Sequence, residues 1–515
     1  MLFPLTLRRS RALSLSTHAL GRVLLAYLSD KEALALVVMV LLVRSADVFY
    51  HFVDWDEASM MSQAWAMTRG EILYRDLPQI HGVLNMAIFV PFFLLFGTDT
   101  APHAIKMLNL ALVLVEALLV RGIARRWLGN QPSALLAAIV FAYTLGRPWA
   151  MSSHGEFYTI VPTLGAVGFL FFPLPRMRLP FRMFTAGMLL STAFFIKQVA
   201  AFDAAALLLA WLVVAPGDHR TKVQALGWFL LGGLVILAAI AAYFFVRGAV
   251  IEWVDSMFLR GLRYSRVTGG PRPSLVLQFV RAVAIELAPA ALSLAAGVAF
   301  VLLSDSHQSA ETRFFLVLLA WLVGSMTAIL LTGRFYDHYL LQLIPAVSLA
   351  AVYIVSRMPP VLCRAFVVGT VTLLFAYAAI SAGLQFRSLR AAAWVPPAVQ
   401  ASRALANAVR SYTRDHDRIF MYETSNLDVF YLSRRLPAAG ITMFIDMAEE
   451  HTGDVEISAA KRQSLAERPP ALILVGTVGT QGFRLPVSEA FFRTLLRRHY
   501  ERVSDVQNVA IYRRR

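Results

Sequence analysis

The sequence has little cysteine, little charge and no repeated unit, and each shortage excludes a class of protein. A single cysteine, Cys363, among 515 residues excludes an internal disulfide and a metal cluster held by thiolates. Charged residues make up 16% of the chain against 58% hydrophobic residues, which is more apolar than a soluble globular protein. The chain shows no internal repeat and no low-complexity tract. This composition predicts an all-α polytopic membrane protein.

The formal net charge of +16 raises the question of nucleic-acid binding. Arginine instead stands in short clusters between apolar segments, as the positive-inside bias and anionic lipid head groups favour. We therefore expect the lipid bilayer, and no nucleic acid, as the partner of these basic residues. The basic start of the chain leads into a long apolar run without a small-residue cleavage site, so 1–32 is expected to be cytoplasmic, before an uncleaved first span.

Apolar runs that approach the roughly 20 residues needed for a crossing predict about eleven transmembrane helices. They fall near 33–50, 104–120, 132–146, 157–173, 183–196, 199–215, 224–246, 276–303, 313–332, 338–356 and 362–384. Basic loops such as GDHRTK and SRMPP alternate onto the side of the Arg-rich N-terminus, which predicts that this side is cytoplasmic. The loops 51–103, 147–156, 247–275 and 333–337 are then extracytoplasmic, and the short apolar segment 83–97 is expected in the outer interface.

From about residue 388 the composition changes to a mixed, charged sequence. Strand-like runs at 417–423 and 470–477 alternate with helical stretches such as 488–503. This alternation predicts a small α/β domain over 388–515, on the extracytoplasmic side, after a membrane domain over 33–387.

Acidic residues gather in the first outer loop, directly after the first span. Charged residues at a membrane boundary are easily solvated, so a hydrated loop without a function is one interpretation. The loop is long, however, and its acids alternate with aromatic residues at a spacing that suits short helices on the membrane surface. Asp56 could also simply cap such a helix.

The run DWDEASMMSQAWAMTRGEILYRD, followed by HGVLNMAIFVPFFLLFG, resembles the first outer loop of the GT-C fold glycosyltransferases that use polyprenyl-phosphate sugars. Aminoarabinose transferases and protein O-mannosyltransferases belong to this superfamily. The resemblance spans 33–356 and implies a bacterial inner-membrane enzyme that moves a sugar from the carrier lipid to an extracytoplasmic lipid, glycan or protein acceptor. The chain departs from the family at IHGVLN, where many members have Pro-Pro-Leu.

The resemblance implies roles for the acids in an inverting transfer. Asp56 is the expected general base, and Glu57 either positions the acceptor or raises the pKa of the pair by like-charge repulsion. Asp54 and Asp76 are weaker candidates, and Asp76 could equally cap a loop. Glu156, in the second outer loop, takes the place of the family's second acid, although an acid also favours a helix N-terminus.

Cations near the outer face are expected to hold the leaving phosphate. Lys197 stands between two spans, in an outer hairpin where it either snorkels or contacts the carrier. The motif GRFYDHY resembles the family's carrier site in supplying Arg334, His338 and Tyr339, which could alternatively be interfacial anchors.

Further candidates lie in three other loops. Arg260 and Arg263 share one helical face in the long loop 247–275 and could bind an anionic ligand or lipid head groups. His81 could replace a family lysine at the phosphate. His154, with Asp56 and Glu156, could bind a divalent cation, but the spacing is not diagnostic and no metal is predicted.

Two other functions fit parts of the pattern. A transporter or flippase of lipid-linked sugars would also have many spans and outer cations, but it should carry polar residues deep in several spans. Here the ionisable residues collect at one face. An O-antigen ligase or polymerase would use a diphosphate carrier, and the acidic loop after the first span argues against it.

Overall fold

The computed structural model describes the chain in stretches. These are 30–51, 54–147, 150–172, 177–260, 277, 280, 281, 284, 310–332, 336–422, 426–438, 463–476 and 486–515. Nearly all of the predicted cytoplasmic segment and of the eighth span lies outside them, as do Arg263 and Arg334.

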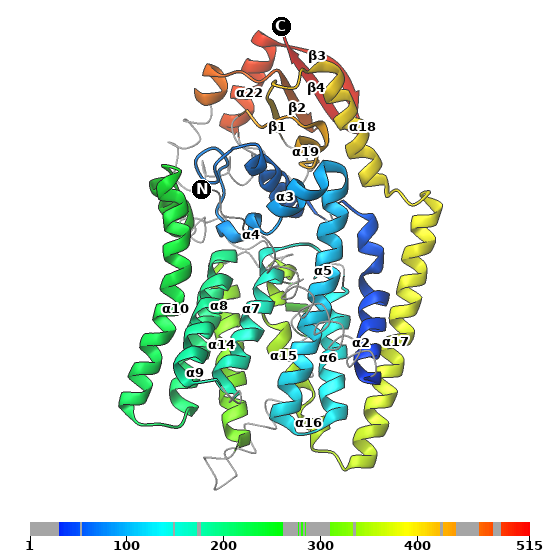
Figure 1. Cartoon of the computed structure of the whole chain (residues 1–515). Coiled ribbons are helices and arrows are strands. Elements are labelled where there is room, and N and C mark those ends of the chain that lie inside the picture. The colour runs from blue at the N-terminus through cyan, green and yellow to red at the C-terminus, as the bar shows by residue number, and fades with distance from the viewer. Residues whose placement is uncertain are drawn as a thin grey trace, which may run out of the picture.

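Upright helices form the body of the molecule (Figure 1). They are α2 (Lys31–Arg44), α5 (Val90–Leu128), α6 (Gln131–Leu145), α7 (Gly155–Phe171), α8 (Leu179–Ile196), α9 (Ala200–Val214), α10 (His219–Val246), α14 (Ala310–Thr332), α15 (Ile344–Ala351), α16 (Tyr353–Ser356) and α17 (Pro360–Ala391). Within the described residues, five helices are long and apolar enough to cross a membrane, and four further apolar helices are shorter. The chain is thus a multi-pass membrane protein by composition, and the number of eleven crossings stays a prediction.

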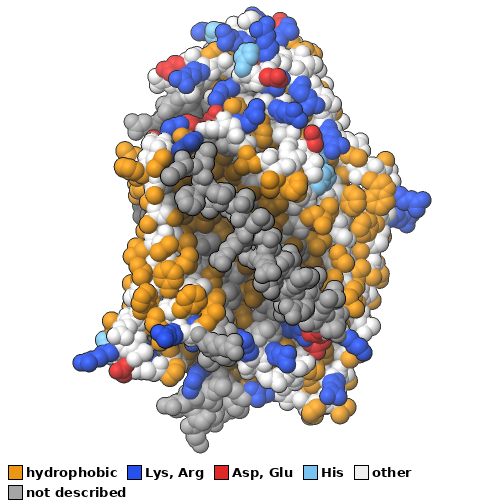
Figure 2. All heavy atoms as spheres, in the orientation of Figure 1, with side chains coloured by type: hydrophobic (Ala, Val, Ile, Leu, Met, Phe, Trp, Pro, Cys, Tyr) orange, Lys and Arg blue, Asp and Glu red, His pale blue; other side chains and the backbone are white. Residues whose placement is uncertain are grey.

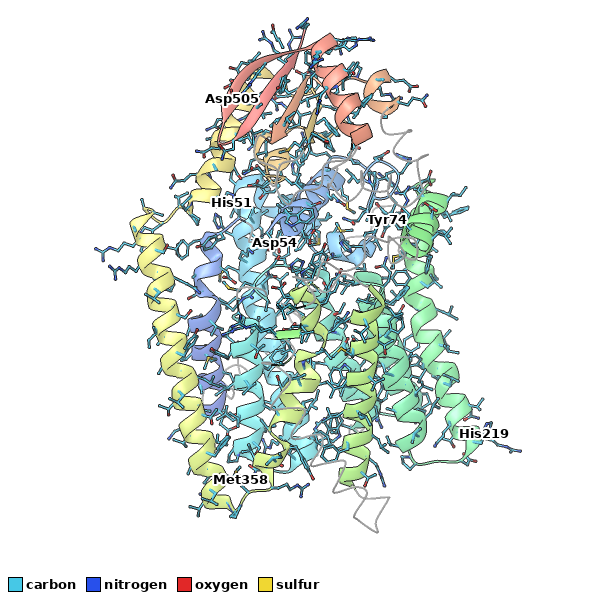
Figure 3. The ribbon with its side chains drawn as sticks, turned by 180° about the vertical axis from the view of Figure 1, so that it is seen from behind. His51, Asp54, Tyr74, His219, Met358 and Asp505 are labelled. Atoms are coloured by element: carbon cyan, nitrogen blue, oxygen red, sulfur yellow. The ribbon has the colours of Figure 1, made fainter. Side chains whose placement is uncertain are left out.

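The distribution of side chains agrees with a membrane position. Figure 2 shows hydrophobic side chains over the middle of the molecule and most Lys and Arg towards its two ends. In Figure 3, His219 and Met358, from two of the loops predicted to be cytoplasmic, lie at one end, and Asp54 and Tyr74 lie towards the other. The predicted alternation of the loops therefore holds for these segments.

Several helix boundaries differ from the predicted spans. Helix α5 continues through the predicted basic loop to Leu128, because Arg125 and Arg126 suit its last turn and Gly129 ends it in the left-handed conformation (φ 65°). The tenth span is not one helix: it is divided into a 3-10 helix, Asp337–Gln342, and the short helices α15 and α16. The first span ends at Arg44 and continues as the 3-10 helix Ser45–Phe49.

The first outer loop forms two helices above the membrane helices, α3 (Trp55–Thr68) and α4 (Val83–Ala87) (Figure 1). The predicted surface helix 83–97 is wrong as a single element. Helix α4 ends at Ala87 and a new helix begins at Val90. The non-helical residue Gly97, with φ of 70° and ψ of −176°, lies at the predicted end of the segment.

The C-terminal region forms a small α/β unit at the end where α3 and α4 lie (Figure 1). It contains α18 (Pro397–Tyr412), β1 (Ile419–Tyr422), α19 (Val429–Ser433), β2 (Leu472–Gly476), α22 (Pro486–His499), β3 (Tyr500–Val506) and β4 (Val509–Arg514). The sheet order is β1-β2-β4-β3, with β1 and β2 parallel and the other pairs antiparallel. Both predicted strands are present, but the predicted helix 488–503 ends at His499, and Tyr500 begins β3.

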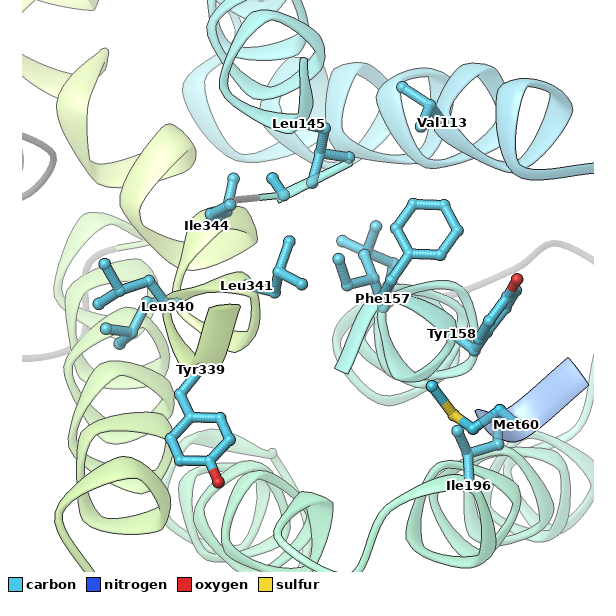
Figure 4. Close-up of a cluster of buried hydrophobic side chains, with 14 of the residues drawn as sticks. Met60, Val113, Leu145, Phe157, Tyr158, Ile196, Tyr339, Leu340, Leu341 and Ile344 are labelled. Atoms are coloured by element: carbon cyan, nitrogen blue, oxygen red, sulfur yellow. The ribbon is translucent and has the colours of Figure 1, made fainter. Parts of the chain in front are cut away.

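An apolar core fills the membrane part up to the acidic loop. Figure 4 shows buried side chains converging from α3, α5, α6, α7, α8, α15 and the 3-10 helix Asp337–Gln342. Three of these residues directly adjoin candidate site residues in the sequence: Phe157 follows Glu156, Ile196 precedes Lys197, and Tyr339 follows His338. Each candidate is therefore fixed by an apolar neighbour that is anchored in the core.

Candidate functional site

Asp54 starts helix α3 and so sets the position of the acids behind it. Its backbone is extended, and its Oδ1 accepts a hydrogen bond from the Glu57 amide at 2.9 Å, which is the geometry of an N-cap. The expectation that Asp56 could be the cap is therefore wrong. Asp54 performs this role and leaves Asp56 in the first helical turn.

Asp56 and Asp54 both face His154 of the second outer loop. The Nε2 atom of His154 lies 2.8 Å from Oδ2 of Asp54, and Nδ1 lies 3.9 Å from Oδ2 of Asp56. Among the described residues, no hydrogen bond to the Asp56 carboxylate is found, and its side chain is 20% exposed. Asp56 is thus the acid of this group that still has an available carboxylate.

Asp54, Asp56 and His154 have pKa values that their surroundings shift in different directions. Burial raises the pKa of Asp56 to about 6, and the negative charge of Asp54 adds to this effect against the opposing charge of His154. Burial disfavours the charged form of His154, but Asp54 outweighs it and raises the pKa of His154 to about 9. Burial also works against the Asp54 ion, yet His154 holds the pKa of Asp54 well below its usual range. Near pH 7, an imidazolium therefore lies between two carboxylates.

Aromatic rings cover the other side of His154. Its ring stacks on His338 with centroids 3.9 Å apart and planes 11° apart. His338 stacks in turn near Tyr336, at 5.5 Å and 11°. The histidine of the motif GRFYDHY therefore lies at the acid cluster. There, the described part of the motif meets the first and second outer loops.

Glu57 points away from Asp56 into a buried polar network. Lys106 of α5 donates to both oxygens of its carboxylate, at 2.6 and 2.7 Å, and neither side chain is exposed. Ser153 also donates to Glu57. Asn109 donates to Ser153 at 2.7 Å and accepts from Tyr158 at 2.6 Å. Glu57 thus ties helix α3 to α5 and to the second outer loop.

Glu156 and Lys197 form a second buried ion pair. Lys197 lies at the end of α8, in the hairpin before α9, and its Nζ donates to Oε1 of Glu156. The same ammonium lies 5.0 Å from the ring centroid of Tyr339. Oε2 of Glu156 is buried and has no hydrogen-bond partner within the described structure. The hairpin predicted at Lys197 is present, and it brings a cation to the acid-bearing loops.

Two glycines allow these segments to approach closely. A Cβ atom on Gly82 would lie 2.0 Å from the carbonyl oxygen of Phe195, so only glycine permits the turn to pack on the end of α8. A Cβ atom on Gly155 would lie 3.1 Å from Cδ of Lys197. The sequence IHGVLN, where the chain departs from the resembled pattern, therefore provides a direct backbone contact with the Lys197 hairpin.

Arg44 holds the second outer loop in place from below. Its guanidinium donates to the carbonyl oxygens of Leu145, Ala150 and Met151 at 2.9 to 3.1 Å. Its Nε lies 2.9 Å from Oδ2 of Asp47. This buried arginine fixes the chain just before His154 and so contributes to the geometry of the acid cluster.

Comparisons with solved structures identify the architecture. The chain superposes on ArnT from Cupriavidus metallidurans in the apo state with a TM-score of 0.61 at 14% identity, covering 96% of this chain and 98% of that one. The form of ArnT bound to undecaprenyl phosphate gives 0.60 and 13%, over 93% and 97%. This chain has the GT-C fold.

A second group of GT-C structures is similar over a shorter share of its length. AglB, the oligosaccharyltransferase of Archaeoglobus fulgidus, gives a TM-score of 0.50 at 11% identity in its complex with an inhibitory peptide and a dolichol-phosphate, covering 88% of this chain and 70% of that one. No protein-family model and no curated protein matches the sequence.

His154 and His338 cannot both ligate one metal ion in the present arrangement of the acid cluster. Ligand atoms of Asp56, His154 and His338 lie within 4.8 Å of one another, whereas Oε1 of Glu156 accepts from Lys197. Metal–nitrogen bonds of about 2.0–2.1 Å lie close to the plane of each imidazole ring. The two rings are nearly parallel and stacked, so their in-plane nitrogen lone pairs cannot meet at one ion. Nε2 of His154 is in addition engaged by Asp54.

Other predicted candidates make local contacts. Asp76 accepts from the amide of Ile72 at 2.8 Å and pairs with Arg75 at 3.0 Å, as a loop cap does. Arg260 pairs at 2.9 Å with Asp255, five residues earlier in the same short helical segment. The carbonyl oxygen of His81 accepts from Tyr74 at 2.8 Å, and burial, with the charges of Lys197 and His154, lowers the pKa of His81 well below its usual range.

Lys106, Arg44 and Ser153 were not predicted as part of the site. Lys106 and Arg44 lie within or at the end of predicted spans, where an ionisable residue costs free energy unless it is paired. The presence of these two ionisable residues in apolar spans was the sequence signal that could have indicated buried partners. Ser153 lies beside His154 in the second outer loop and carried no distinguishing pattern.

Proposed function

We propose that this protein is an integral-membrane glycosyltransferase that moves a sugar from a polyprenyl-phosphate carrier to an acceptor hydroxyl outside the cytoplasm. The single observation that carries the proposal is the pairing of an available carboxylate, Asp56, with the nearby cations His154 and Lys197 on a GT-C fold. In support, the similar ArnT and AglB structures hold undecaprenyl phosphate and a dolichol-phosphate, respectively.

The proposed reaction is one direct displacement. The acceptor oxygen attacks the anomeric carbon while the bond from that carbon to the phosphate oxygen breaks, and the bonding electron pair leaves with the phosphate. Asp56 takes the acceptor proton, a role that suits a carboxylate with a pKa of about 6. A single displacement inverts the anomeric configuration. His154, held by Asp54, favours the ionised form of Asp56 before the proton is transferred.

Lys197 is proposed to hold the leaving phosphate. Its ammonium lies in the hairpin between α8 and α9, where the carboxylate of Glu156 neutralises its charge. A phosphate that enters beside Tyr339 would share or replace that carboxylate as the partner of the ammonium. The charge that develops on the leaving group is then stabilised by a cation already in place.

Lys197→Met is expected to weaken donor binding by about 10- to 150-fold, which corresponds to the 1.5–3 kcal/mol of a charge-assisted hydrogen bond. The double variant Lys197→Met/Glu156→Gln removes the buried carboxylate left without its partner and is expected to restore stability but not affinity. Lys222→Met is the matched control, because Lys222 donates to Leu212 at the opposite end of the membrane domain. Binding of a labelled polyprenyl-phosphate would be measured, and unchanged affinity in Lys197→Met would remove Lys197 from the site.

The pH dependence of kcat/KM is expected to be bell-shaped. Activity should rise through about pH 6 as Asp56 loses its proton, and fall above about pH 9 as His154 loses its positive charge. In His154→Gln the cation that lowers the pKa of Asp56 is gone at every pH, so the acidic limb should move to higher pH, and activity above it should reach only the low level that the wild type shows above about pH 9. His219→Gln, at the far end of the molecule (Figure 3), should leave the profile as in the wild type. An unmoved acidic limb in His154→Gln would contradict the assignment.

The acceptor class is tested in cells. Mass spectrometry of glycolipids, surface polymers and membrane proteins, compared between a strain with this protein and one without it, should show one sugar lost from one of these classes. A transporter of lipid-linked sugars would instead leave purified protein without transfer activity on a synthetic polyprenyl-phosphate sugar, and that result would overturn the proposal.

A further inference from the structure

We propose that the C-terminal domain is a positioning element of the site: the segment 427–433 and Arg418 hold helix α3 in place, and with it Asp56. This inference rests on the proposed function in assigning Asp56 as the base, but the mechanical part stands on contacts alone.

The first contact lies in the middle of α3. Ser62 is six residues beyond Asp56, about 9 Å along the helix. Its buried hydroxyl donates to the carbonyl oxygen of Leu427 at 2.6 Å. Leu427 is itself buried and lies in the turn that leads into α19. A buried carbonyl that lost this donor would be left unsatisfied, so the bond holds the two segments in one relative position.

The second contact lies just after the end of α3. Arg418 donates to Glu71 at 2.6 Å, and the Glu71 carboxylate is only 12% exposed. Arg418 also donates to the carbonyl oxygen of Pro437 at 2.8 Å. Its own carbonyl oxygen accepts from the amide of Ala471, at 2.9 Å, beside the paired strands β1 and β2. The arginine that reaches Glu71 is thus fixed by the sheet of the C-terminal domain.

The contacting segment is firmly held within its own domain. All five residues of α19 are buried. Asp428 accepts from Ser402 of α18 at 2.9 Å, and Arg410 of the same helix donates to the carbonyl oxygen of Leu432 at 2.6 Å. Figure 1 shows α19 between the sheet and α3. The segment therefore transmits the position of the whole domain to α3.

Positioning by this domain should affect the chemical step more than donor binding. A general base must lie within hydrogen-bond reach of the proton it takes, and a misplacement of about 1 Å can cost on the order of 100-fold in rate. Lys197 is held instead by Glu156 and Tyr339, from the membrane part. Removing the contacts between α3 and the C-terminal domain should therefore lower kcat and leave the KM of the donor nearly unchanged.

The test uses the full-length protein in lipid nanodiscs, with the variants Ser62→Ala and Arg418→Gln. In both, we expect kcat to fall about tenfold or more while donor KM changes less than about twofold. Hydrogen exchange of backbone amides in 55–68 should be faster by a similar factor, with exchange in α14 unchanged. Ser62→Thr keeps the hydroxyl and should behave like the wild type, and the swap Glu71→Arg/Arg418→Glu should recover most of the loss of Arg418→Glu.

Glu501→Gln is the matched control, because it breaks an ion pair of 2.7 Å to Arg513 in the same domain but on the β3–β4 hairpin. It should change neither kcat nor exchange in α3. The inference would be overturned if exchange in 55–68 were unchanged in both Ser62→Ala and Arg418→Gln. It would also be overturned if kcat stayed constant and only the KM of the donor rose. If the wild type shows no transfer at all, the proposed function fails, whereas the exchange measurement still decides whether the domain holds α3.

Discussion

Asp56→Asn is expected to lower kcat by about 10²- to 10⁴-fold, the range that a positioned general base contributes. Asparagine has the same shape as aspartate, so the first turn of α3 should persist, but its amide cannot accept the acceptor proton. Donor binding should stay close to that of the wild type because Lys197, and not Asp56, is proposed to contact the phosphate. Initial rates with a purified protein and a synthetic polyprenyl-phosphate sugar would measure the change.

Neighbouring acids provide the controls for this result. Asp76→Asn should retain most of the activity, because the Asp76 carboxylate caps its own loop and pairs with Arg75. Asp54→Asn preserves a capping oxygen but removes the charge that holds His154. It should therefore move the alkaline limb of the pH profile to lower pH rather than abolish transfer. Full activity in Asp56→Asn would show that another group is the base.

Much of the site could be predicted because it is encoded locally. Asp54, Asp56 and Glu57 stand within four residues, so any helix beginning there brings them to one end. The hairpin at Lys197 followed from two apolar runs that are together too long for one crossing. Strands β1 and β2 followed from short runs rich in β-branched and aromatic residues. In each case the physical cause lies within one short stretch of chain.

The partner of each acid could not be predicted, because the partners are far apart in the sequence. Glu57 meets Lys106 across 49 positions, and Lys197 meets Glu156 across 41. Hydrophobic periodicity places helices but does not give their relative rotation, so it could not show which lysine faces which acid. The sequence suggested that Glu57 positions the acceptor or raises the pKa of the pair by like-charge repulsion, whereas its pairing with Lys106 favours a role as a buried support of α3.

Helix ends were the other weak point, since hydropathy does not register backbone breaks. The apolar segment 83–97 is divided where α4 ends at Ala87 and the next helix begins at Val90, without any drop in hydrophobicity. Likewise, 338–356 reads as one apolar run, yet its first residues form a 3-10 helix that brings His338 against His154. At this position, the departure from a regular span is what brings the histidine to the site.

Lys106→Met is expected to reduce the stability of the protein by about 3–5 kcal/mol, the cost of leaving one member of a buried ion pair without its partner. Neither Lys106 nor Glu57 is exposed, and the two lysine hydrogen bonds to the carboxylate hold α3 against α5. In Lys106→Met, the Glu57 carboxylate would keep the hydroxyl of Ser153 but lose its charge partner. Denaturant-induced unfolding in detergent, followed by tryptophan fluorescence, would measure the loss.

The double variant Lys106→Met/Glu57→Gln separates charge from packing. Removing both charges avoids the unpaired carboxylate, so most of the stability lost in Lys106→Met should return. As a matched control, Arg502→Met breaks an exposed pair with Asp505 and should cost less than about 1 kcal/mol. If the double variant were as unstable as Lys106→Met, the lysine would act through its apolar stem. If it were stable and still transferred sugar, Glu57 would be a support of the helix rather than a reacting group, and Asp56 would be the one acid of the pair needed for proton transfer.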